Sequence, residues 1–135
     1  GNGDTNSLNN PNYSYFQPGI YPVTLIAYNG LGCSDDTVIG PIVINPTPIL
    51  NAFTDTTLSC DSSYNFTFTG TSSNTSISNW QWDFGDGYNI SSTLNSVQYS
   101  YDSSNTFKPS VTGISTDGCT DSINLDEIKI QKKYR

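Results

Sequence analysis

Apolar and aromatic residues alternate with polar ones in short segments spread along this chain. The clearest segments are 21–29, 64–70, 80–84 and 97–101. A period of two places every second side chain on one face of a β-strand, and no segment of a dozen residues has the spacing of an amphipathic helix. Clusters of Gly, Asn, Asp and Ser separate the segments, as is typical of tight turns. The sequence therefore predicts an all-β protein built as an antiparallel β-sandwich.

The charge of the chain argues against several classes of partner. Its formal net charge is -7, with only five Lys and Arg among 135 residues. Nucleic acids and anionic lipid surfaces both attract basic faces, and a segment that spans a bilayer needs about 18 or more apolar residues in a row. We therefore expect no nucleic acid as partner and no direct membrane insertion. The chain also has no His, the commonest general base, and shows no nucleophile–base constellation, so we expect no enzyme activity.

An internal repeat organises the chain. Residues 13–36 align without gaps with residues 99–122, and the matched pairs include Tyr13 and Tyr99, Tyr15 and Tyr101, Tyr21 and Phe107, Leu25 and Val111, Gly32 and Gly118, and Cys33 and Cys119. Upstream, GNGDTNS (1–7) aligns with GDGYNIS (85–91) when the second copy carries two additional residues. An internal repeat of this kind predicts a tandem architecture.

The repeat predicts how the chain divides into domains. We expect residues 50–131 to form a complete unit and residues 1–45 to form the C-terminal half of a preceding one. Residues 46–49 contain two prolines and are expected to be a stiff linker. Residues 132–135 would be a tail or the start of the next linker.

Two motifs carry a resemblance to a known family. WDFGDG (82–87), followed by YSY (99–101), and YSYFQPGIYPVTLIAYN (13–29) resemble the PKD domain family. This resemblance implies an Ig-like β-sandwich. GCSDD and GCTDS, paired with an upstream Cys, are similar to PKD-like repeats in large surface proteins of Bacteroidetes. The second copy departs from the pattern, with Asn105 at the position of Gly19 and Pro109 at the position of Val23.

The segment around the tryptophans allows two interpretations, and we favour the structural one. Alternation would point Trp80, Trp82 and Phe84 into the core. Asp83 and Asp86 would then cap backbone N–H groups of a turn in which Gly85 and Gly87 supply conformational freedom. The alternative is a site in which the indoles stack on a sugar and the two carboxylates bind Ca²⁺. Because Ca²⁺ takes six or more oxygen ligands, we expect no cofactor and keep Ca²⁺ only as the alternative.

Three cysteines lie at Cys33, Cys60 and Cys119. Cys60 falls early in the complete unit and Cys119 near its end, so we expect a Cys60–Cys119 disulfide. Cys33 occupies the position of Cys119 in the first copy and would be unpaired here, with its partner upstream of residue 1. Three free thiols in a reducing compartment are the alternative. A zinc site is not favoured, because the chain has neither His nor a CxxC pair.

The half-unit at residues 1–45 would expose an apolar face and open strand edges. We expect the chain to be a piece of a longer tandem array. The alternative is that strands from a neighbouring molecule complete the half-unit.

The resemblance implies a non-catalytic repeat that acts as spacer and adhesive module of a large bacterial surface protein. Similar repeats occur in flavobacterial gliding-motility adhesins, which are exported by the type IX secretion system. The expected location is extracellular, on the outer-membrane-associated cell surface. Expected partners are neighbouring repeats of the same polypeptide, polysaccharide or surface proteins, and the secretion machinery during export. The alternative is an accessory substrate-binding or spacer domain of a secreted hydrolase.

Overall fold

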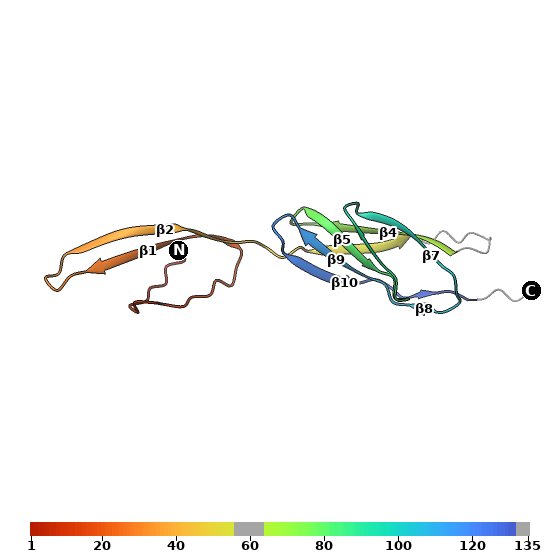
Figure 1. Ribbon diagram of the computed structural model, residues 1–135, viewed down its shortest axis with the longest axis horizontal. Helices are drawn as coiled ribbons and strands as arrows, with labels where there is room; N and C mark the ends of the chain where they lie inside the picture. Colours follow the sequence, from red (N-terminus) through yellow and green to blue (C-terminus); the bar gives the residue numbers. More distant parts are fainter. Residues whose placement is uncertain (56–63, 132–135) are drawn as a thin grey trace, which may run out of the picture. The chain divides into compact units, whose positions relative to one another are not determined.

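The computed structural model describes residues 1–55 and 64–131, and the regular elements among them are all β-strands (Figure 1). The chain divides into two compact units, Gly1–Pro46 and Thr47–Arg135. None of the described residues belongs to a helix that is long and apolar enough to cross a membrane. The prediction of an all-β, antiparallel protein is confirmed.

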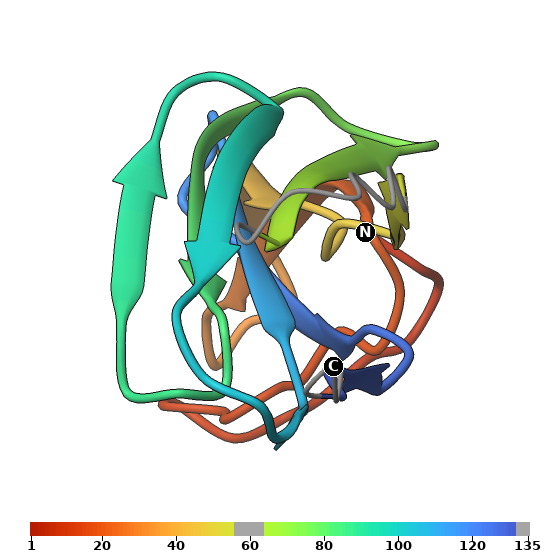
Figure 2. The ribbon, with the colours of Figure 1, turned by 90° about the vertical axis from the view of Figure 1, so that its right-hand side faces the viewer.

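The second unit contains two larger antiparallel sheets, seen end on in Figure 2. One sheet has four strands in the order β10-β9-β5-β6 and the other has three in the order β3-β4-β7, while β8 and β11 form a short separate pair. The bounds are β3 Leu50–Asp55, β4 Tyr64–Ser72, β5 Ile77–Asp83, β6 Asn89–Ser92, β7 Ser96–Tyr101, β8 Thr106–Phe107, β9 Ser110–Ser115, β10 Thr120–Asn124 and β11 Ile128–Lys129. This is the layered arrangement of a β-sandwich.

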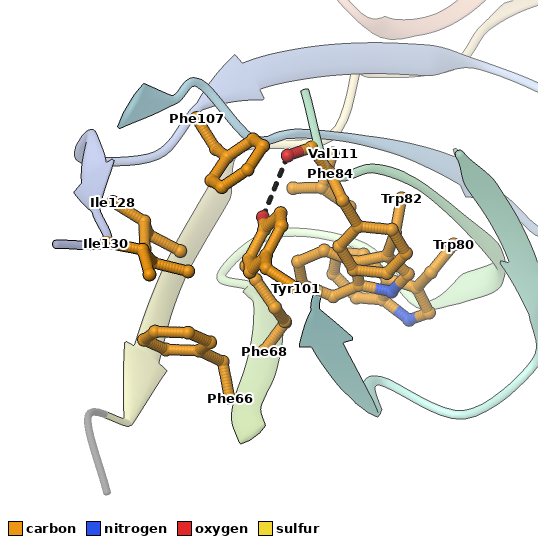
Figure 3. Close-up of a cluster of buried hydrophobic side chains, with 10 residues drawn as sticks. All are labelled: Phe66, Phe68, Trp80, Trp82, Phe84, Tyr101, Phe107, Val111, Ile128 and Ile130. Atoms are coloured by element: carbon orange, nitrogen blue, oxygen red, sulfur yellow. Dashed lines mark hydrogen bonds between the residues drawn. The ribbon is translucent and has the colours of Figure 1, made fainter. Parts of the chain in front are cut away.

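Alternation along these strands builds a core of mainly aromatic side chains (Figure 3). The buried hydrophobic residues are Phe66, Phe68, Trp80, Trp82, Phe84, Tyr101, Phe107, Val111, Ile128 and Ile130. Aromatic rings in such a core pack edge to face or offset, as Phe68 does on Phe84 with centroids 5.0 Å apart. Both sheets contribute to the cluster, which holds them together.

The first unit contains one antiparallel pair, β1 (Gly19–Tyr28) and β2 (Ser34–Ile44). The pairing register shifts between Tyr21 and Val23, which marks a β-bulge. An isolated pair of strands cannot bury both of its faces. Leu25 and Ile39 are accordingly 54% and 52% exposed.

Candidate functional site

The segment with the two tryptophans runs along β5 and into the turn before β6. Trp80, Trp82 and Phe84 are 4%, 1% and 0% exposed, so all three face the core (Figure 3). Trp82 lies between Val111 of β9 and Ile90 of β6 in the sheet. Its indole N–H is buried and has no hydrogen-bond acceptor among the described residues. No indole face of this segment is open to stack on a sugar ring.

Trp80 is covered by a glycine of the facing sheet. A Cβ added to Gly70 would lie 2.5 Å from Cζ3 of Trp80, closer than any real contact. The absence of a side chain at this position therefore lets the two sheets approach each other over the indole. The signal in the sequence is a lone glycine within a strand pattern, which is typical of close backbone approach.

The two aspartates of the turn accept hydrogen bonds from backbone N–H groups. Asp83 Oδ1 accepts a hydrogen bond from the N–H of Gly85 at 2.8 Å, and Asp86 Oδ1 accepts one from the N–H of Tyr88 at 2.9 Å. These are Asx-type contacts that stabilise tight turns. The described residues contain no cluster of three or more Asp, Glu, Cys or His side chains that could hold a metal ion. The arrangement of the two carboxylates is that of turn-forming groups.

The glycines of the turn have left-handed backbone conformations, with φ of 77° at Gly85 and 93° at Gly87. The two positions differ in their surroundings. A Cβ on Gly85 would lie 2.6 Å from the backbone nitrogen of Lys108, whereas a Cβ on Gly87 would meet nothing within 4 Å. Gly85 is therefore required both by conformation and by the close passage of a second segment, and Gly87 by conformation alone.

Two tyrosines of β7 bind this turn through hydrogen bonds that the alternation pattern does not predict. Tyr99 donates a hydrogen bond of 2.6 Å to Asp86 Oδ2, and its ring stacks on Phe84 with centroids 3.8 Å apart. Burial, followed by the hydrogen bond to Asp86, raises the pKa of Tyr99 to about 12. Tyr101 donates a buried hydrogen bond of 2.8 Å to the carbonyl of Phe84, and burial raises its pKa too. The signal for both roles was the Tyr-x-Tyr pattern that occurs in each copy of the repeat.

The first unit reproduces the β9–β10 turn of the second. The backbone N–H of Asn29 donates to the carbonyl of Cys33 at 2.9 Å, as that of Ser115 does to Cys119 at 2.8 Å. The φ angles of Gly32 and Gly118 are 86° and 85°. Equivalent sequences therefore fold into equivalent turns, although among the described residues the core of buried hydrophobic side chains belongs to the second unit.

The strand register and the aromatic stacking are also equivalent. Tyr15 stacks on Tyr21 with centroids 4.0 Å apart and an interplanar angle of 18°, and Tyr101 stacks on Phe107 at 4.1 Å and 17°. Every pair of cross-strand partners in β9–β10 and in β8–β11 corresponds, in the repeat alignment, to a pair of cross-strand partners in β1–β2. For example, Leu25 pairs with Thr37 as Val111 pairs with Ile123.

The glycine turn is repeated as well. A Cβ on Gly1 would lie 2.8 Å from the carbonyl oxygen of Pro22, the residue that aligns with Lys108. Tyr13, the counterpart of Tyr99, donates a hydrogen bond to Asp4, and Asn2 donates one to Tyr13. The hydrogen bond from Tyr13 is the main cause that lowers the pKa of Asp4. The turn that begins the first unit is thus the counterpart of the Gly85–Gly87 turn.

The cysteines occupy the matching turns. Cys33 is exposed and Cys119 is half-buried. The N–H of Cys33 donates to Asn29 Oδ1 at 2.9 Å, and that of Cys119 donates to Ser115 Oγ at 3.1 Å. Cys60 lies outside the described residues, so the Cys60–Cys119 disulfide stays a prediction.

Two facing antiparallel sheets, an aromatic core and a glycine turn fastened by tyrosines define an Ig-like sandwich module. The profile of the PKD domain family matches residues 45–130. The chain belongs to the PKD domain family. The matched region is therefore a PKD module, a type of domain that is itself non-catalytic and typically occurs in extracellular proteins.

Comparison with solved structures gives the same fold. The chain is similar to the PKD1 domain from the Vibrio cholerae metalloprotease PrtV, with a TM-score of 0.52 and 20% sequence identity. The match covers 64% of this chain and 100% of the other. A search of curated protein sequences found no match.

Proposed function

We propose that this chain is a non-catalytic link in a tandem array of PKD-like repeats that belongs to a large adhesin on a bacterial cell surface. The observation that carries the proposal is the residue-by-residue equivalence of the first unit and the C-terminal part of the second in register, turn conformation and ring stacking. In this proposal residues 1–45 are the C-terminal half of one repeat and residues 50–131 are a complete repeat. Residues 46–49 link the two, and residues 132–135 lead out of the second.

The proposed role is mechanical. Sandwiches in series act as stiff spacers, and Pro46 and Pro48 restrict the linker between them. The core couples both sheets through Tyr101 and Phe84, so one strand cannot be pulled away without breaking buried contacts. A disulfide between Cys60 and Cys119 would add about 4 kcal/mol by limiting the unfolded chain. The proposed partners are neighbouring repeats, surface polysaccharide or surface proteins. The proposed export route is the type IX secretion system, and the proposed process is gliding motility.

A second candidate is an accessory domain beside a secreted hydrolase. The observation that favours it is the structural likeness to a PKD domain taken from a metalloprotease. Such a domain would act as a spacer or would bind substrate next to a catalytic domain.

The proposal is tested by two measurements: whether this chain is exposed on the surface of intact cells, and whether the parent protein supports attachment of those cells. Intact cells that produce the parent protein are treated with protease, and the released peptides are identified by mass spectrometry. The proposal expects peptides of residues 1–135 in the released fraction and reduced attachment or spreading after deletion of the parent gene. Peptides found only after cell lysis, or a deletion strain whose only defect is loss of hydrolysis, would contradict the adhesin proposal.

A further inference from the structure

The second unit shows what covers the edge that is open in the first unit. In the second unit β9 pairs with β10 on one side and with β5 on the other. In the first unit β1 corresponds to β8 and β9 and pairs with β2, and no further described strand joins that sheet. The backbone edge of β1 that corresponds to the β5 side of β9 is therefore unpaired among the described residues. Such an edge is a template for an added strand.

The side chains on the same face are apolar and uncovered. Leu25 is 54% exposed and its counterpart Val111 is 1% exposed, while Ile42 is 42% exposed and its counterpart Ile128 is 7% exposed. Apolar side chains stabilise a fold when a packed element removes them from water. The first unit thus has the residues of a sandwich core on a face that no described strand covers.

Tyr15 and Gly1 mark where the missing strand would end. In the second unit Tyr101 donates its hydroxyl hydrogen to the carbonyl of Phe84, the residue directly before Gly85. Tyr15 is the counterpart of Tyr101 and Gly1 is the counterpart of Gly85. Among the described residues the Tyr15 hydroxyl has no hydrogen-bond acceptor. Its equivalent acceptor would be the carbonyl of the residue that leads into Gly1.

We propose that the free edge of β1 binds a strand of the β5 type, with bulky aromatic residues at alternate positions, that leads directly into Gly1. This inference rests on the proposed repeat assignment and specifies the partner of the half-unit. The occupant is a polypeptide segment with the residue pattern of Thr47–Phe84, supplied by the same array.

The register follows from the pairing of β5 with β9, where Trp82 lies opposite Val111 and Trp80 opposite Gly113. In the first unit, the position of Trp82 falls opposite Leu25 and that of Trp80 opposite Ala27. The incoming indole would then be the cross-strand neighbour of Leu25, as Trp82 is of Val111 in the second unit. A shift of one residue would turn the aromatic side chains away from the apolar face.

The experiment is a fusion that supplies the strand. A second copy of residues 47–84 is joined to Gly1 of the 135-residue chain, so that its last phenylalanine directly precedes Gly1. Hydrogen exchange is measured on the backbone amides of β1 in the fusion and in the original chain. The expected result is at least a 100-fold slowing of exchange in β1. The control has one serine inserted between the added phenylalanine and Gly1, and should lose most of that protection.

A second measurement keeps the test decisive if the fusion does not fold. A synthetic peptide of residues 64–84 is added to the intact chain, and a scrambled peptide is the control. Protection of β1 by the first peptide alone supports the proposal. Equal exchange with both peptides in a folded chain, or no slowing in a folded fusion, would overturn it. Concentration-dependent dimers of the original chain that protect β1 without any added strand would also overturn it, since the occupant would then be a second copy. The surface-exposure test of the proposed function is independent of all these outcomes.

Discussion

The hydroxyl of Tyr101 donates a buried hydrogen bond of 2.8 Å to the backbone carbonyl of Phe84. Tyr101 belongs to the β3-β4-β7 sheet, and Phe84 follows β5 of the other sheet. Tyr101 is only 2% exposed, so no solvent competes for this contact. The bond therefore joins β7 of one sheet to the segment that follows β5 of the other sheet, directly before the glycine turn.

Removing this hydroxyl should destabilise the second unit. In Tyr101→Phe the ring and its stacking remain, but the Phe84 carbonyl loses a buried donor, and we expect a loss of about 1–3 kcal/mol in the free energy of unfolding. Urea denaturation followed by tryptophan fluorescence measures it. Tyr15→Phe is the matched control, since no residue that the structure describes offers Tyr15 such an acceptor. Equal stability of wild type and Tyr101→Phe would contradict the role assigned to the bond.

The two glycines of the turn should respond differently to alanine. Gly85→Ala brings a methyl group to within 2.6 Å of the Lys108 backbone and also strains a positive φ, so a loss of about 3 kcal/mol or more is expected. Gly87→Ala meets open space and should lose only about 1–2 kcal/mol through its φ. Thermal unfolding of the two variants compares them. A larger effect at Gly87 than at Gly85 would argue against the close approach of the Lys108 segment.

Alkaline pH should destabilise the second unit through its tyrosines. An unfolded tyrosine has a pKa of about 10, and the folded pKa of Tyr99 is raised to about 12 by burial and by its hydrogen bond to Asp86. The contribution to stability is complete below about pH 10 and is lost as the pH rises toward 12, because the unfolded chain ionises first. Urea midpoints measured from pH 8 to 12 should fall in this range, and less steeply in Tyr99→Phe. A flat profile would refute the raised pKa.

Cysteine chemistry tests the predicted pairing. Alkylation of the oxidised protein, unfolded in denaturant without any reductant, should modify one thiol, at Cys33, because Cys60 and Cys119 would be protected as a disulfide. Peptide mass spectrometry locates the label. Three alkylated cysteines would show that the predicted disulfide does not form.

Much of the core was predictable because it depends on local alternation. The period of two placed Trp80, Trp82 and Phe84 on one face, and the structure buries all three. The aspartate and glycine spacing likewise indicated a tight turn, since these contacts join residues two positions apart. Neighbouring residues determine both features, so the sequence alone is sufficient to suggest them.

Contacts between the sheets were not predictable in the same way. The Tyr99–Asp86 hydrogen bond, the Tyr101–Phe84 hydrogen bond and the approach of Gly70 to Trp80 join segments that are distant in the sequence. Their geometry depends on how two sheets pack, which no local pattern specifies. The repeat indicated that these tyrosines have a structural role, because they occur in both copies. It did not indicate which residues they contact.

The most direct test of the tandem-array account is peptide mapping of the parent protein purified from the cell surface. The account predicts a large polypeptide in which the 135 residues are flanked by further copies of the same unit, each with the glycine turn, the Tyr-x-Tyr pattern and its cysteines. A parent in which a catalytic domain directly adjoins this chain and no other copy occurs would contradict it and would assign the chain to an accessory role.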